Sequence, residues 1–250
     1  MISFVKKNLY FIIFLAIFGL VGGYFAGLYT IQSTDPALLE EAISQLGSVE
    51  LIAAITAVQA MGYALFCGLV GRLIAEKIGL WTSASPSARS ILAVAAVSVI
   101  GGCTLILSDT LFFSSSISEV IKDSYLVKPT IENVIASLTY GGVVEEMMLR
   151  LFFMSLIAFI LMKLSRKDAP TIAQLVWANI ISATIFAAGH LPATALMLGL
   201  SPIIIFRCFL LNGGIGLLFG RLYRKYGIWY AILAHAGVHI VAKLIWALFI

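Results

Sequence analysis

The sequence predicts an all-α fold: a polytopic bundle of seven to eight transmembrane helices around a polar cavity, with residues 1–250 forming a single integral membrane domain. Two observations predict this class. Hydrophobic residues occupy 61% of the 250 positions and charged residues only 11%, whereas soluble domains carry about 25% charged residues. The hydrophobic residues also gather into seven long runs, and a helix needs about 20 apolar residues to cross a bilayer.

The predicted spans are residues 8–30, 51–75, 90–112, 131–163, 171–195, 201–221 and 227–249. The first is too long for a signal-peptide core and lacks an A-x-A cleavage pattern, so we expect it to be retained. The fourth is longer than one upright crossing requires, so it is tilted, broken near Gly141-Gly142, or begins outside the hydrocarbon core. A break would create the eighth helix. Segments 32–50 and 113–130 are expected to be surface loops, the first of them acidic and partly helical.

Basic residues occupy alternate loops, which predicts the orientation. By the positive-inside rule, these ends are cytoplasmic, including the N-terminus. The residues concerned are Lys6, Lys7, Arg72, Lys77, Arg89, Lys163, Arg166, Lys167, Arg221, Arg224 and Lys225. Short loops favour a prokaryotic plasma membrane. The net charge of +4 is explained by this orientation, and without a basic stripe we expect the lipid bilayer, not nucleic acid, as a partner.

The three cysteines lie singly inside apolar runs, with no CxxC pair and no spacing typical of a disulfide framework or a metal site. They are Cys67, Cys103 and Cys208. We therefore interpret them as small core residues.

Ionisable side chains at membrane depth are costly unless they are paired or hydrated, so each one indicates a functional site. Here they cluster in the second half of the chain, and all three histidines of the sequence lie in its later spans. The cluster consists of Glu145, Glu146, Arg150, His190, His235 and His239.

Helical spacing predicts different roles for the two glutamates. Glu146 and Arg150 are four residues apart and share a face, which favours a charge-assisted ion pair. Glu145 points about 100° away from that face, so it is the freer carboxylate and a candidate general base for activating water. The alternative is that all three charges form a buried network that only holds helices together.

Each histidine lies among small residues, which allow helices to approach closely. His190 shares a helical stripe with Phe186, whereas His235 and His239 are four residues apart, a spacing at which two imidazoles can hold one metal ion or one water. Glu145 and His190 are almost the same number of residues away from the turn at 165–170 that joins their helices, so they should lie at the same depth. His235 reaches that depth only if a helix is tilted, broken or offset. A hydrogen-bonded packing role is the alternative for these histidines.

Three motifs follow one another in segment 131–249: EExxxR at Glu145–Arg150, FxxxH at Phe186–His190, and an HxxxN-like motif at His235–His239. Together they resemble the CPBP family, the CAAX proteases and bacteriocin-processing enzymes also called the Abi family of intramembrane proteases. The resemblance implies about eight helices around a water-accessible catalytic cavity, and peptide-bond hydrolysis.

The resemblance also assigns roles to residues. It implies that Glu145, His190 and His235 are catalytic and that Glu146, Arg150 and Phe186 support them. The last motif departs from the family pattern, because His239 stands where the family usually has an oxyanion-binding Asn; a histidine can also donate a hydrogen bond.

Two mechanisms fit these residues. In one, Glu145 deprotonates a water held by His190, and His235 with His239 stabilises the oxyanion without a metal. In the other, His190, His235 and a carboxylate bind Zn²⁺, which activates the water. The first is slightly favoured because the chain has no HExxH motif, and zinc stays the alternative.

Three functions follow. The preferred one is an intramembrane endopeptidase, similar to CAAX prenyl proteases, acting on a membrane-associated or lipidated peptide or protein. The second is a non-catalytic immunity or scaffold protein of the same family. A transporter using Glu145 and Arg207 as a relay is weaker, because the sequence has no repeated halves. We expect Arg207 and Lys243 to snorkel toward the membrane surface; for Lys243, four residues after His239 on the same stripe, the alternative is that it orients a substrate carboxylate.

Overall fold

The computed structural model describes residues 2–82, 84–114 and 128–249, and within these residues every regular element is helical. Seven helices are long and apolar enough to cross a membrane, and they form a bundle, so the predicted fold class is confirmed. The chain is an integral membrane protein. The seven spans are Asn8–Gln32, Val49–Lys77, Ala88–Phe113, Ile131–Leu164, Ile172–Leu196, Pro202–Tyr226 and Ile228–Phe249.

The helices include four π-helical segments, labelled η. In order the elements are α1 (Ile2–Gln32), α2 (Pro36–Leu46), α3 (Val49–Lys77), α4 (Ala88–Leu107), η1 (Ser108–Phe113), α6 (Ile131–Ala136), η2 (Ser137–Glu145), η3 (Met147–Met154), α7 (Ser155–Leu164), α8 (Ile172–Gly189), α9 (Leu191–Leu198), α10 (Pro202–Cys208), η4 (Phe209–Gly213), α11 (Gly214–Tyr226) and α12 (Ile228–Phe249). Helix α2 confirms the partly helical segment expected within 32–50. The other expected loop lies mostly outside the described residues.

The spans begin and end where local chemistry favours it. Thr171 starts α8 with a capping box, in which Thr171 and Gln174 each bind the other's backbone N–H. Ser48 accepts a hydrogen bond from the backbone of Leu51 at the start of α3. Gly227, with a positive φ of 103°, makes the tight turn between α11 and α12.

The fourth span is one continuous helical rod from Ile131 to Leu164 and does not break at Gly141-Gly142. It changes winding instead, because η2 and η3 flank Glu146 with π-type turns. Such turns often occur at functional sites. No eighth span arises from α9 either, since it extends α8 past a turn at His190.

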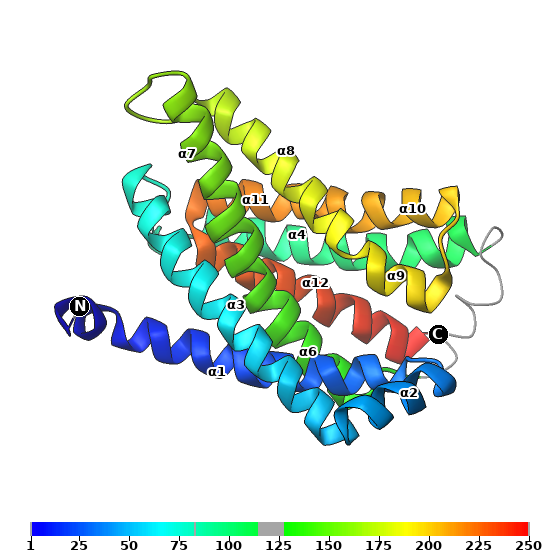
Figure 1. The fold of residues 1–250 in the computed structure, drawn as a ribbon. Coiled ribbons are helices and arrows are strands. Elements are labelled where there is room, and N and C mark those ends of the chain that lie inside the picture. The colour runs from blue at the N-terminus through cyan, green and yellow to red at the C-terminus, as the bar shows by residue number, and fades with distance from the viewer. Residues whose placement is uncertain (1, 83, 115–127, 250) are drawn as a thin grey trace.

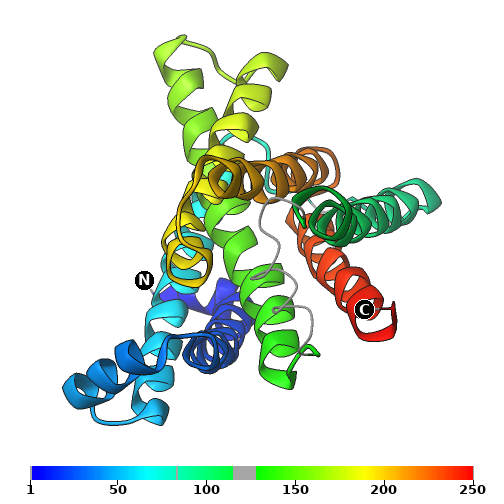
Figure 2. The ribbon, with the colours of Figure 1, turned by 90° about the vertical axis from the view of Figure 1, so that its right-hand side faces the viewer.

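The two ends of the bundle differ (Figure 1). One end carries the N-terminus, the α7–α8 turn and the α11–α12 turn; the other carries α2, the α9–α10 turn and the C-terminus. Figure 2 looks onto the second end. Most of the buried apolar core lies between the fourth span, α11 and α12, on the side of the first end.

The three cysteines are free, as expected for core residues. Cys67 and Cys208 are buried, and Cys103 is partly buried.

Candidate active site

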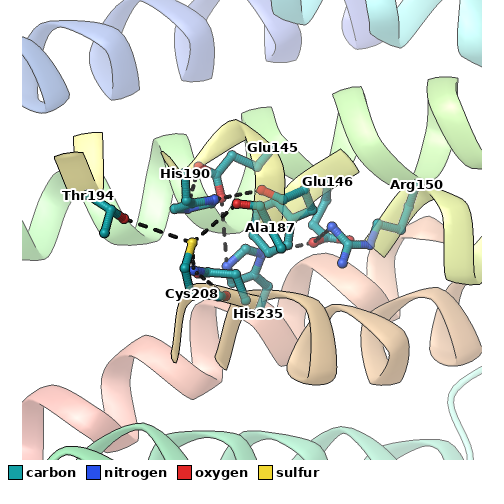
Figure 3. A network of polar contacts seen from close by, with 10 residues as sticks. Glu145, Glu146, Arg150, Ala187, His190, Thr194, Cys208 and His235 are labelled. Atoms are coloured by element: carbon teal, nitrogen blue, oxygen red, sulfur yellow. Dashed lines mark hydrogen bonds and ion pairs between the residues drawn. The ribbon is translucent and has the colours of Figure 1, made fainter. Parts of the chain in front are cut away.

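Four of the predicted residues meet in one cavity of about 300 Å³, lined by the fourth span, α4, α8, η4, α11, α12 and the end of α1. Glu145, His190, His235 and His239 all line it. Figure 3 shows Glu145 between His190 and His235, with Glu146 and Arg150 beyond His235. The structure therefore brings together the whole cluster that the sequence singled out.

Glu146 is the buried centre of this cluster. Its side chain is 0% exposed, and its Oε1 lies 3.1 Å from Nη1 of Arg150, which is 1% exposed. The ion pair expected from helical spacing is confirmed. The same Oε1 accepts a hydrogen bond of 2.8 Å from Nδ1 of His235 on α12, a contact that the sequence did not predict.

Arg150 also binds beyond its own helix. Its Nη2 donates to the backbone carbonyl of Gly216 over 2.9 Å, and its guanidinium lies 4.8 Å from the ring centre of Phe186 and 5.4 Å from that of Phe219. Gly216 is required for this approach, because a Cβ there would lie 2.7 Å from Arg150 Nη2. These contacts offset part of the free-energy cost of burying the guanidinium charge in apolar surroundings.

Glu145 differs from Glu146 in that it faces the cavity. Its side chain is 17% exposed, and its two oxygens lie 3.9 Å from Nε2 of His190 and 3.9 Å from Nε2 of His235. Both separations are too long for direct hydrogen bonds. They suit carboxylate and imidazole groups that both face a water molecule or a substrate atom.

The contacts of both histidines orient their rings. His190 Nδ1 lies 2.8 Å from the carbonyl oxygen of Phe186, and since a carbonyl can only accept, Nδ1 carries the proton. His235 Nδ1 likewise donates to Glu146. Both rings therefore present Nε2 to the cavity. Phe186 packs its ring edge against His190 at 4.7 Å between ring centres.

His239 stacks on His235 with ring centres 5.0 Å apart and lines the same cavity. Gly141 makes room for it, because a Cβ at Gly141 would lie 3.1 Å from His239 Nε2. Gly142 in turn lets η2 approach α12 closely, with Ala236 opposite. Small residues thus have the role that the sequence suggested at these two positions, whereas a Cβ at Gly189 would meet no atom of the described residues within 4 Å.

The depth question is resolved by an offset. Glu145 and His190 lie level, as expected, and His235 lies level with them as well. Helix α12 is unbroken. The α7–α8 turn projects beyond the α11–α12 turn (Figure 1), so a shorter stretch of α12 reaches the same depth.

Asn212 is a cavity residue that sequence reasoning missed. It lies in η4, and its amide donates to the carbonyl oxygen of Cys208 over 3.1 Å and contacts Cys208 Sγ at 3.5 Å. The Cys208 thiol in turn donates to the carbonyl of Ala187, shortly before His190 on α8 (Figure 3). The sequence did carry a signal for Asn212. Its polar amide lies within the predicted apolar span 201–221, and polar groups at membrane depth indicate a functional site.

The donor chemistry of the site suits zinc, but its spacing does not. Two imidazole nitrogens and a carboxylate are a common zinc donor set, and ligand atoms about 2.1 Å from one tetrahedral ion lie roughly 3.4 Å apart. Here the Nε2 to carboxylate distances are 3.9 Å. Within the described ranges, no group of three His, Cys, Asp or Glu residues is placed to hold one ion.

Arg207 pairs with a carboxylate of another helix, a contact that the sequence did not predict. It forms a two-pronged ion pair with Asp109 of η1, in which Nε donates to Oδ1 over 2.6 Å and Nη2 donates to Oδ2. Asp109 is buried. The pair joins η1 to α10. It gives Arg207 a structural contact that is independent of Glu145.

A second cavity, of about 340 Å³, adjoins the first. Tyr140, Glu145, Phe186 and His190 line both, so these side chains form the wall between them. The rest of the second lining is apolar and comprises Met148, Leu149, Phe153, Ile185, Gly189 and Ala193. An apolar chamber thus opens directly beside the Glu145 carboxylate.

Comparison with known proteins identifies one related family. Residues 128–241 match the family model described as Rce1-like: Type II CAAX prenyl endopeptidase Rce1-like. The matched segment contains all three motifs and is consistent with the CPBP family, so the resemblance is confirmed. No curated protein and no solved structure matches the chain.

Proposed function

We propose that this chain, whose residues 128–241 match the Rce1-like model of type II CAAX prenyl endopeptidases, is an intramembrane endopeptidase that hydrolyses a peptide bond through a glutamate-activated water. The observation that carries the proposal is the placement of one partly exposed carboxylate, Glu145, 3.9 Å from two imidazole nitrogens in a single cavity. A carboxylate and an orienting histidine are the groups that general-base hydrolysis needs.

The proposed reaction begins with a water between Glu145 and His190. With its proton on Nδ1, neutral His190 accepts a hydrogen bond at Nε2 and orients the water, while Glu145 accepts the proton as the water attacks the scissile carbonyl. His235, held by Glu146, and His239 face the developing oxyanion, to which the N–H of a neutral His239 ring can donate a hydrogen bond. Glu145 then returns the proton to the leaving amine.

The substrate that fits this site is a membrane-associated or lipidated peptide or protein. The apolar second cavity supports this class, because it adjoins Glu145 and His190 and offers an apolar surface to a side chain or lipid group next to the scissile bond. No step of the proposed reaction uses a metal, and the Nε2 to carboxylate distances of 3.9 Å, which are longer than the usual spacing between zinc ligands, support this choice. Zinc held by His190 and His235 with Glu145 is the alternative, which metal analysis tests.

For localisation, we propose a prokaryotic plasma membrane with a cytoplasmic N-terminus. The seven spans found leave the basic residues in alternate loops, which supports this orientation under the positive-inside rule.

The decisive experiment compares the membrane peptides of cells that express wild type with those of cells that express Glu145→Gln. We expect peptides cut by wild type to remain intact with Glu145→Gln, with kcat on an identified substrate reduced at least about 100-fold. The variant keeps its place in the membrane and its fold, because Glu145 makes no direct hydrogen bond to either histidine. A non-catalytic immunity or scaffold protein instead gives identical peptides for both proteins, with function retained in the variant.

A further inference from the structure

The described residues at the two ends of the bundle carry opposite charges. The end with the α7–α8 and α11–α12 turns is basic and bears Lys163, Arg166, Lys167, Arg224 and Lys225, among others. The opposite end is acidic: it bears Asp35, Glu40, Glu41, Glu50 and Glu132, against one basic residue, Lys128, among the described residues named here. Such an asymmetry places the basic end in the cytoplasm and the acidic end on the other side of the membrane.

The lining of the catalytic cavity extends toward the acidic end. Its outer lining comes from the last turns of α1 and α4 and the first turns of the fourth span, namely Tyr29, Thr30, Leu105, Ala136 and Ser137. Thr30 is exposed. All of these segments end at the face onto which Figure 2 looks.

Toward the basic end the cavity is closed by packed side chains. Met147, Met154, Phe219 and Tyr223 follow the catalytic level on the fourth span and α11, and each is at most 1% exposed. All four belong to the main apolar core. A core packed at this density leaves no passage for a peptide from the cytoplasmic side.

We infer that the catalytic cavity opens to the extracytoplasmic surface, and that its substrate is a polypeptide segment exposed on that surface, such as the outer part of a membrane-anchored chain. The inference about the substrate rests on the proposed function. The inference about the membrane side rests only on charge distribution and packing.

The test places one cysteine at each of three positions and labels intact cells with a membrane-impermeant maleimide. Ala37→Cys and Ala169→Cys are a matched pair of exposed alanines at the acidic and basic ends, and Thr30→Cys reports on the cavity mouth. Wild type, whose three cysteines lie within spans, provides the background. We expect Ala37→Cys and Thr30→Cys to be labelled in intact cells, and Ala169→Cys only after lysis. Any other pattern, equal labelling included, overturns the inference.

Labelling is scored without a cleavage assay, so the two proposals fail separately. If Glu145→Gln leaves membrane peptides unchanged while the labelling pattern holds, the peptidase proposal alone is lost. Where cleavage is detected, external labelling of Thr30→Cys should slow it at least tenfold relative to labelled Ala37→Cys. Unchanged cleavage would show that the substrate does not enter by this mouth.

Discussion

Glu146→Gln tests whether Glu146 is a structural carboxylate, in contrast to Glu145, the proposed general base. Glutamine preserves the shape of the side chain and still accepts the hydrogen bond from His235, but it leaves the Arg150 guanidinium, which is 1% exposed, without its counter-charge 3.1 Å away. Removing one partner of a buried ion pair costs about 3–5 kcal/mol. Arg150 keeps its bond to the Gly216 carbonyl and its contacts with Phe186 and Phe219, so we expect the lower end, about 3 kcal/mol.

Thermal unfolding of the purified protein in detergent measures this effect. A loss of about 3 kcal/mol corresponds to a Tm roughly 6–12 °C lower for a chain of this size. Glu145→Gln is the matched control, one residue away: its 3.9 Å contacts and partial exposure predict a change below about 1 kcal/mol. Adding Arg150→Met to Glu146→Gln should recover part of the loss, because the stranded charge disappears. Equal Tm values for Glu146→Gln and wild type, or equal losses in both single variants, would refute the reasoning.

Three other predictions follow from the site. Replacing His239 by Asn, the residue usual in the family, should retain kcat, whereas His239→Ala should lower it by about 10²–10³-fold if the ring stabilises the oxyanion; equal rates for the two variants would exclude that role. Gly216→Ala places a Cβ 2.7 Å from Arg150 Nη2 and should destabilise the protein by about 2 kcal/mol, because the hydrogen bond from Arg150 is lost. The control Gly214→Ala, with open space around it, should be neutral or stabilising in the same unfolding assay. A larger loss of stability in Gly214→Ala than in Gly216→Ala would contradict the packing argument. Dialysis against a chelator should leave peptidase activity intact, and a loss restored by Zn²⁺ would instead assign the water-activating step to a metal held by His190 and His235.

Interactions within one helix were predictable because they depend on spacing along the sequence. Glu146 and Arg150 pair as the four-residue spacing requires, and His235 and His239 stack for the same reason. The position of each span was predictable from hydropathy, because the thickness of the bilayer sets the length of an apolar helix. The separation of a freer Glu145 from a paired Glu146 also follows from helical geometry.

Interactions between helices were not predictable in the same way. The bond from His235 to Glu146 joins residues 89 positions apart, and that from Arg150 to the Gly216 carbonyl joins residues 66 positions apart. The pairing of Arg207 with Asp109 spans 98 positions, and spacing along the sequence gives no sign of it. Hydropathy does not specify how a helix is rotated or offset against its neighbours, which depends on side-chain packing.

By itself, the sequence predicted that this protein crosses a membrane seven to eight times, that its polar cluster lies in the later spans, and that Glu146 pairs with Arg150. Tertiary structure alone decided that Glu145, His190 and His235 face one another across a cavity, that Asn212 joins them, and that packed side chains close the cavity toward the basic end. The physical reason is that hydrophobicity and helical spacing act along one chain segment, whereas the shape and opening of a cavity depend on which small and large side chains meet when several helices pack.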